Sequence, residues 1–178
     1  MFQINDLLSL RYDSDDYEKT EQLKLKLLNL RKSRNPMYLN LLEFDEILRW
    51  KLRNQFGRQG KLRAENTDTV VREVTRAVFS INHTDKDYET ELKLGLLCTI
   101  KGVGVPVASA ILALLQPNDY CVIDFRGWSQ IFGEKKNSFT INDYKLYLAE
   151  VQKIASQIGW PVQEVDLAIW ELDRRKKI

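Results

Sequence analysis

Residues 97–112 carry the sequence LCTIKGVGVPVASAIL, which predicts two helices joined by a tight turn. Gly102 and Gly104 lie in the turn, where glycine permits positive φ and close approach of the backbone to a ligand. Pro106 follows in the first turn of the second helix, where a missing amide hydrogen costs no intrahelical hydrogen bond. The stretch therefore predicts a helical hairpin whose second helix points its first backbone amides outward.

Helical periodicity continues on both sides of the hairpin. Apolar residues recur at helical spacing in three sets, which are Phe44, Ile47, Leu48 and Leu52, then Val70, Val74 and Val78, then Tyr144, Leu148, Val151, Ala155 and Ile158. N-cap signals precede three helices and lie at Asn66 or Thr67, near Asp87, and at Thr140 with Asp143. Residues 120–123 are β-prone and are expected to be extended between two helices. We expect an all-α protein with roughly eight or nine helices.

The composition of the 178-residue chain, with 44% hydrophobic and 29% charged residues, is typical of a packed globular protein. The formal net charge of +2 is too small to identify a nucleic-acid ligand, but the charge is unevenly distributed. No acidic residue interrupts the basic residues between positions 49 and 63, which are Arg49, Lys51, Arg53, Arg58, Lys61 and Arg63. This stretch predicts a positive face of the kind that binds phosphate backbones.

The two cysteines, Cys98 and Cys121, are isolated and lack the paired spacing of zinc or iron–sulfur ligands. We therefore expect no metal centre, no iron–sulfur cluster, no other cofactor and no disulfide framework. The N-terminal residues do not resemble a secretion signal, and no run approaches roughly 18 consecutive apolar residues. These features predict a cytoplasmic protein that does not associate with a membrane.

The hairpin is a candidate phosphate site, because backbone amides at a helix N-terminus attract anions. The residues expected to hold one DNA phosphate are Lys101, Gly102, Val103 and Gly104. Such a contact reads no base, so binding is expected to tolerate many sequences. The same turn is a candidate site for a monovalent cation. An ordinary glycine-rich connection between two helices is the alternative.

Residues 100–124 resemble the DNA glycosylases of the helix-hairpin-helix superfamily, which includes endonuclease III, adenine glycosylase, 8-oxoguanine glycosylase and alkyladenine glycosylases. The matching residues are Ile100-Lys101-Gly102-Val103-Gly104, Ala108, and Val122-Ile123-Asp124 twenty residues beyond the second glycine. The match extends over residues 92–133, about a quarter of the chain. The resemblance implies two helical lobes around a cleft, with double-stranded DNA as the partner and no obligate protein partner.

The resemblance also implies a division of the chain. We expect a single glycosylase-like domain over residues 1–178, in which residues 38–133 form a central lobe that includes the hairpin at 92–115. Residues 1–37 and 134–178 are then expected to form the second lobe.

Asp124 matches the aspartate that, in this superfamily, begins a helix facing the base pocket. Breaking an N-glycosidic bond develops positive charge on the sugar. A fixed carboxylate can stabilise that charge and orient or deprotonate the attacking water. The resemblance therefore implies that Asp124 is catalytic. Capping of the following helix would by itself also explain an aspartate here.

The chain departs from the superfamily pattern at several positions. Pro106 stands where members that also cleave the strand carry a lysine, so a monofunctional enzyme without that Schiff-base route is expected. Arg126 replaces a common histidine, and Ser129 replaces a common arginine. Arg126 is a candidate phosphate ligand, with a salt bridge as the alternative. The C-terminal four-cysteine loop of some relatives is absent.

A glycosylase must extrude its target base, so it needs a side chain to fill the stack and a pocket to receive the base. In the superfamily the wedge lies on the loop after the helix that corresponds to residues 44–52. The candidates for wedge or strand contact are Arg53, Asn54, Gln55 and Arg58. The candidates for the base pocket are Trp50, Trp128 and Tyr38, although aromatic residues usually fill cores and edges.

Together these patterns predict a DNA-binding, monofunctional base-excision glycosylase that hydrolyses the N-glycosidic bond of a damaged or modified base. The alternative is a non-catalytic helix-hairpin-helix module that binds distorted or branched DNA. A third interpretation is a helical protein-interaction domain whose hairpin is only structural.

Overall fold

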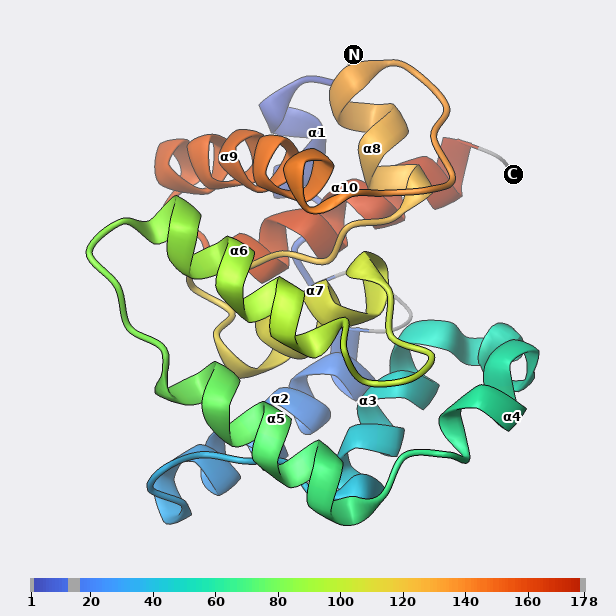
Figure 1. Cartoon of the computed structure of the whole chain (residues 1–178). Coiled ribbons are helices and arrows are strands. Elements are labelled where there is room, and N and C mark those ends of the chain that lie inside the picture. Colours follow the sequence, from blue (N-terminus) through green and yellow to red (C-terminus); the bar gives the residue numbers. More distant parts are fainter. Residues whose placement is uncertain (1, 13–16, 177–178) are drawn as a thin grey trace.

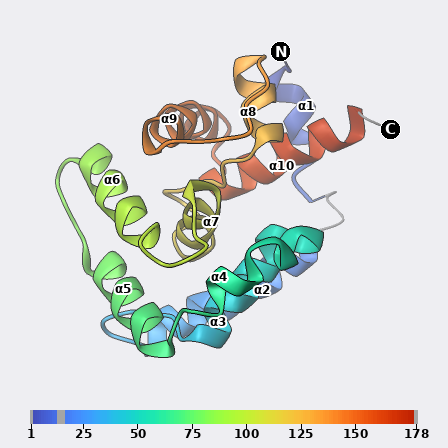
Figure 2. The ribbon, with the colours of Figure 1, turned by 45° about the vertical axis from the view of Figure 1, so that its right-hand side comes forward.

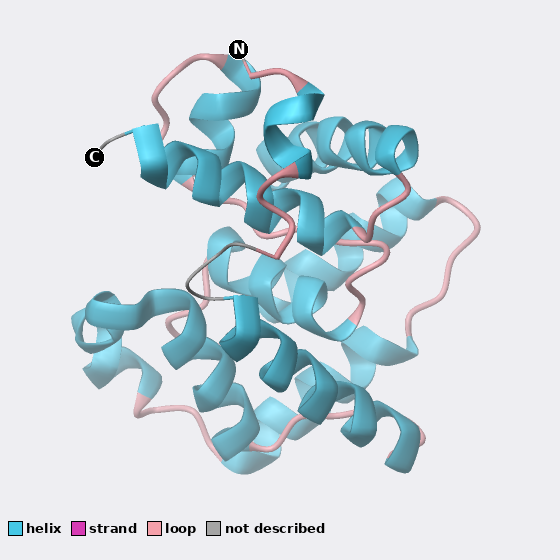
Figure 3. Ribbon diagram, turned by 180° about the vertical axis from the view of Figure 1, so that it is seen from behind, coloured by secondary structure: helices cyan, strands magenta, loops and turns pink. Residues whose placement is uncertain are grey.

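The computed structural model describes residues 2–12 and 17–176, which form helices and connecting loops without a strand (Figure 1, Figure 3). The α-helices are α1 (Ile4–Leu8), α2 (Tyr17–Ser33), α3 (Leu41–Leu52), α4 (Gly60–Arg63), α5 (Asp68–Ser80), α6 (Lys86–Leu97), α7 (Val105–Leu115), α8 (Phe125–Phe132), α9 (Ile141–Ile158) and α10 (Val162–Lys176), and the 3₁₀ helix η1 (Arg53–Gln59) follows α3. The all-α prediction is confirmed. Helices α1 and α4, of five and four residues, are too short to show an apolar period, and they raise the number above the prediction. None of the described helices is both long and apolar enough to cross a membrane.

The N-cap signals of the sequence begin the helices around the hairpin. Thr67 caps α5, Asp85 caps α6, and Thr140 forms a capping box with Asp143 at the start of α9. Gly159 ends α9 with a φ of 71°, in the left-handed conformation. Local side-chain chemistry therefore decides where these helices begin and end.

The buried face of α5 differs from the prediction. Val70 is 45% exposed, whereas Val71 and Val78 are fully buried. Thr75 lies on the same face, and its hydroxyl donates to the Val71 carbonyl at 2.7 Å and accepts the Leu39 amide at 2.9 Å. A threonine hydroxyl that both donates and accepts a hydrogen bond can be buried at little cost in free energy. The buried face therefore follows Val71, Thr75 and Val78.

Helix α7 is the centre of the hydrophobic core. Ten of its eleven residues are buried, and it packs against α2, α3, α6, α9 and α10. In Figure 2, α7 lies between a group of helices that contains α2 to α5 and a group that contains α1, α8, α9 and α10. One continuous cluster of buried apolar side chains includes members of both groups. The turn that precedes α7 is thus held on a rigid support.

The division of the chain into two lobes at residues 37 and 133 stays a prediction. Helix α2 packs against α7, and α8 packs against α9 and α10. The segment that leads into α8 is hydrogen-bonded to α7 through Ser109 and to α10 through Asp166, and these contacts place Asp124.

Candidate active site

The turn between α6 and α7 requires glycine at residue 102. Gly102 has a φ of +78°, and a Cβ atom there would lie 2.6 Å from Cγ of Arg63. Arg63 is buried beside the turn, where its guanidinium donates to the Phe56 carbonyl and lies over the Phe56 ring. The side-chain amide of Asn66 exchanges two hydrogen bonds with the Lys101 backbone, at 2.8 and 3.1 Å. The turn is therefore fixed from two sides.

The predicted phosphate ligands of the turn differ in their surroundings. The Val103 amide donates to the Ile100 carbonyl at 3.0 Å, so it is used within the turn. The ammonium group of Lys101 is half exposed and pairs with Glu65. Gly104 is the N-cap of α7, and its carbonyl accepts two amides of the first helical turn.

Two backbone amides remain the best candidates for a phosphate contact. Pro106 has no amide hydrogen, and helical geometry gives the amides of Gly104 and Val105 no acceptor within α7. The carbonyls of Ile100 and Gly104 already accept hydrogen bonds. The monovalent cation predicted for this turn stays a prediction.

A segment held by two helices leads to Asp124. The Val122 amide donates to Oδ2 of Asp166 on α10 at 3.1 Å, and the Ile123 amide donates to Oγ of Ser109 on α7 at 3.1 Å. Asp124 itself is extended, with a φ of −152° and a ψ of 176°, and α8 begins at the next residue. The position of the carboxylate is thus set by the core.

The two carboxylate oxygens of Asp124 have different surroundings. Oδ1 accepts the amides of Arg126 and Gly127, each at 2.9 Å, and so caps α8. Oδ2 lies 3.7 Å from Nζ of Lys51 on α3, and the Asp124 side chain is 22% exposed. Lys51 also donates to the Ile123 carbonyl at 3.4 Å. Capping therefore orients the carboxylate while its second oxygen faces a cation.

Asp124 lies on the wall of a cleft of about 610 Å³, which we call the outer cleft. Its volume is within the roughly 300–1,000 Å³ typical of ligand sites. The charged residues that line it are one acid, Asp124, and the four cations Lys51, Arg53, Arg58 and Arg126. Three aromatic side chains, Phe125, Phe139 and Trp170, add flat apolar surface. Cations interleaved with aromatic rings favour a nucleic-acid ligand.

The outer cleft brings together residues that the sequence separates. All four wedge candidates, Arg53, Asn54, Gln55 and Arg58, line it together with Asp124. Pro106, from the first turn of α7, lines it as well. One cleft therefore holds the predicted acid, the predicted wedge segment and one end of the hairpin.

The wedge segment begins at a strained residue. Arg53 has a φ of 50° and a ψ of −123°, a conformation that glycine takes at the first central position of a type II′ turn. Its guanidinium lies 4.6 Å from the centre of the Trp170 ring. Strain of this kind is stored preferentially at functional sites, which supports a role for this edge of the outer cleft.

A smaller cavity of about 50 Å³, which we call the inner chamber, shares Lys51, Arg53, Asp124 and Trp170 with the outer cleft. The residues that belong to the inner chamber alone are Trp50, Val122, Gln163, Asp166 and Leu167. Asp124 therefore stands on the boundary between the two spaces.

Asp166 is a nearly buried carboxylate in the inner chamber. It accepts the Tyr147 hydroxyl at 2.7 Å and the Val122 amide at 3.1 Å. Burial raises the pKa of Asp166 to about 7, and the negative charge of Asp124 acts in the same direction. The two hydrogen bonds and the charge of Lys51 oppose this rise in pKa. Asp166 thus titrates close to neutral pH, next to the candidate catalytic carboxylate of Asp124.

Of the three aromatic pocket candidates, Trp50 alone shares a cavity with Asp124. Trp50 lines the inner chamber, with its indole donating to Thr20 on α2 at 3.0 Å. Trp128 is buried against Phe132 and Phe139, and Tyr38 lies on the loop before α3, where three arginines surround its ring. Neither Trp128 nor Tyr38 lines a cavity that contains Asp124. Packing explains both positions.

Arg126, the one arginine predicted to bind phosphate at the hairpin, and two arginines of the basic stretch are engaged within the chain. Arg126 forms an ion pair with Asp173 at 2.7 Å, and Asp173 is nearly buried. The guanidinium groups of Arg49 and Arg63 lie 4.2 and 4.4 Å from the centre of the Phe56 ring. Arg63 is therefore a structural cation, and the phosphate contact of Arg126 stays a prediction.

Sequence reasoning missed three features of this site. Gln163 and Trp170 lie on α10, and Lys51 was expected only as part of a basic stretch. Asp166 was expected only as one of several acids that a cleft could recruit, with a solvated face or a salt bridge as the alternative. Its sequence signal is that it interrupts the apolar face that carries Val165 and Ile169. A carboxylate on a buried face needs a specific environment.

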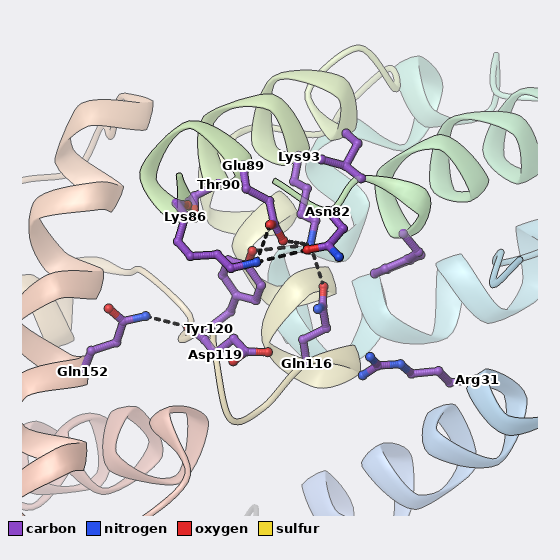
Figure 4. A pocket seen from close by; sticks show the side chains of 12 residues that line it. Arg31, Asn82, Lys86, Glu89, Thr90, Lys93, Gln116, Asp119, Tyr120 and Gln152 are labelled. Carbon is purple, nitrogen blue, oxygen red and sulfur yellow. Dashed lines mark hydrogen bonds and ion pairs between the residues drawn. The ribbon is translucent and has the colours of Figure 1, made fainter. Parts of the chain in front are cut away.

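A third cavity, of about 420 Å³, is lined by residues of α2, α5, α6 and α9 and of the segments that follow α5 and α7, and a buried ion pair lies on its wall (Figure 4). Nζ of Lys93 lies 2.5 Å from Glu89, and Glu89 also accepts the His83 amide at 2.9 Å and the Lys86 ammonium at 2.7 Å. Burial alone would raise the pKa of Glu89, but these three donors lower it to about 2. The hydrogen bonds satisfy the buried charges, which is typical of a structural network.

Comparisons of the chain with models of protein families, with curated proteins and with solved structures found no match. Function is therefore inferred from the geometry of the outer cleft and from the sequence pattern at residues 100–124.

Proposed function

We propose that this chain binds double-stranded DNA in the cytoplasm and acts as a monofunctional base-excision glycosylase. The observation that carries the proposal is the position of Asp124. Its Oδ1 is fixed by α8, while its Oδ2 faces Lys51 in a cleft that also contains the wedge segment. A fixed carboxylate in a cationic and aromatic cleft suits a reaction that develops positive charge on a DNA sugar.

The proposed reaction is hydrolysis at C1′ of the nucleotide whose base is extruded. The amides of Gly104 and Val105 hold one backbone phosphate, and the cations of the outer cleft hold neighbouring phosphates. Asp124 stabilises the positive sugar and accepts a proton from the attacking water as the C1′–N bond breaks. Pro106 occupies the cleft wall where lyases of the resembled superfamily carry lysine, which supports the monofunctional assignment.

Base release from damaged DNA tests this proposal. Purified protein is incubated with duplexes that carry deaminated, oxidised or alkylated bases, and alkali then cleaves the strand at each abasic site. We expect release from at least one duplex, and we expect Asp124→Asn to slow it roughly a hundredfold or more. Asp85→Asn is the matched control, because Asp85 caps α6 through two amides just as Asp124 caps α8, but away from the outer cleft.

One observation favours the alternative of a non-catalytic DNA-binding module, since capping of α8 already explains an aspartate at residue 124. That module would bind distorted or branched duplexes in a salt-dependent manner without releasing a base. Lys101→Glu would weaken its binding, and Asp124→Asn would not. Affinity for DNA no higher than that of an acidic control protein would instead favour a protein-interaction domain.

A further inference from the structure

The inner chamber contains a buried polar group without a partner. The Gln163 side chain is 1% exposed, and among the described residues its Oε1 atom has no hydrogen-bond partner. An unsatisfied buried carbonyl costs about 1–3 kcal/mol, so most such groups in proteins are paired with protein atoms or ordered water. Gln163 is one of the residues that line the inner chamber, so a small molecule held there would lie next to this side chain.

The size and lining of the inner chamber select water as that molecule. Its volume of about 50 Å³ is far below the roughly 300 Å³ at which small-molecule sites begin, but it exceeds the 10–15 Å³ that one water needs. An ordered buried water makes about three hydrogen bonds. Gln163, Asp166 and Asp124 supply polar atoms on the chamber wall, and Lys51 supplies an ammonium group.

We propose that the inner chamber holds the attacking water of base excision, with Gln163 and Asp166 as the positioning residues that present it to Asp124. This inference rests on the proposed function. Because Asp124 lines both spaces, a water in the inner chamber lies next to the carboxylate that faces the outer cleft, where the sugar would bind.

The proposed step balances without a cofactor. The water oxygen forms a bond to C1′ as the C1′–N bond breaks, and the electron pair of that bond leaves with the base. Asp124 takes one proton from the water, and the departing base takes up a proton from solvent. Gln163 accepts a hydrogen bond from the water before the reaction and thereby fixes the direction of its attack.

Gln163→Met tests the proposal, because methionine keeps the length of the side chain and removes its amide. Base release is measured in single turnover with enzyme in excess, together with the Kd for the same duplex. We expect the rate constant to fall at least about tenfold with Kd unchanged, because only the water has lost its acceptor. Gln152→Met, which alters an exposed glutamine of α9, is the control.

A merely structural glutamine would behave differently. If the inner chamber were dry, removal of the unpaired carbonyl oxygen would raise the free energy of unfolding and leave the rate constant unchanged, and that result would overturn the proposal. A high-resolution crystal structure gives a second readout, since ordered water density within hydrogen-bond distance of Gln163 Oε1 is expected and a dry chamber would contradict it. If the wild type releases the base, and release is slowed by Asp124→Asn but not by Gln163→Met, this inference alone is wrong. If the wild type releases no base, the proposed function is wrong as well.

Discussion

Asp166→Asn should change how the stability of this protein depends on pH. The carboxylate is buried, and the titratable or charged groups that interact with it are Asp124, Lys51, Tyr144, Tyr147 and Cys121. Its pKa of about 7 in the folded protein lies above the ordinary aspartate value of 3.8. The folded state therefore keeps a proton that the unfolded state has released between these two pH values.

The magnitude follows from this difference in pKa. A rise of about three pKa units corresponds to about 4 kcal/mol, at 1.36 kcal/mol per unit. Because the pKa of Asp166 is raised on folding, the Asp166 carboxyl group stabilises the folded state below about pH 4. This stabilisation is lost as the pH rises through about 7. The asparagine side chain that replaces it cannot ionise, so the variant escapes this loss. Relative to wild type, the free energy of unfolding of Asp166→Asn should therefore rise by up to about 4 kcal/mol when the pH is raised from about 4 to about 8.

Urea denaturation of both proteins at these two pH values measures the difference. Using the change between two pH values cancels any constant cost of replacing the carboxyl group by an amide. Asp45→Asn on α3 is the control, because Asp45 lies outside both cavities that contain Asp124. Parallel pH profiles for wild type and Asp166→Asn would refute the reasoning, since they would mean that Asp166 ionises as it does in the unfolded chain.

Three further predictions concern the hairpin, Lys51 and the third cavity. Gly102→Ala should lower the free energy of unfolding by about 1–3 kcal/mol, because alanine must take positive φ against the side chain of Arg63. Gly104→Ala, whose nearest contact is at 3.9 Å, should cost about 1 kcal/mol or less, and equal losses in urea denaturation would contradict the turn geometry. Borohydride added to the protein on an abasic duplex should trap no covalent adduct, whereas an adduct that Lys51→Arg abolishes would show that the enzyme is not monofunctional. Glu89→Gln should lower the free energy of unfolding by up to about 3 kcal/mol near neutral pH. This difference from wild type should shrink as the pH falls from 4.5 toward about 2, because wild-type Glu89 then takes up a proton. A difference that does not depend on pH would argue against the buried ion pair.

Local chemistry made part of this structure predictable. Thr67, Asp85 and Thr140 cap helices where their side chains allow it, and Gly102 stands where positive φ is required. These features depend on residues a few positions apart. The N-cap position of Asp124 is of the same kind.

The rest depends on contacts between distant parts of the chain. Lys51 meets Asp124 only because α3 packs against α7, and α7 also holds the segment before α8. No sequence pattern near residue 51 predicts that contact. Gln163 reaches the inner chamber from α10 for the same reason. Trp128 was a candidate for the base pocket, but its side chain is buried in the core. The sequence does not distinguish a tryptophan that packs in a core from one that lines a pocket.

Base release by Asp124→Asn, compared with wild type on one duplex at one salt concentration, tests the central claim most directly. The Kd for the duplex is measured in the same buffer, so that catalysis and binding are separated. We predict that the variant binds with unchanged Kd while its rate constant for base release falls roughly a hundredfold or more. A variant that releases the base as fast as wild type would contradict the assignment of Asp124 as the catalytic residue and would leave it as the cap of α8.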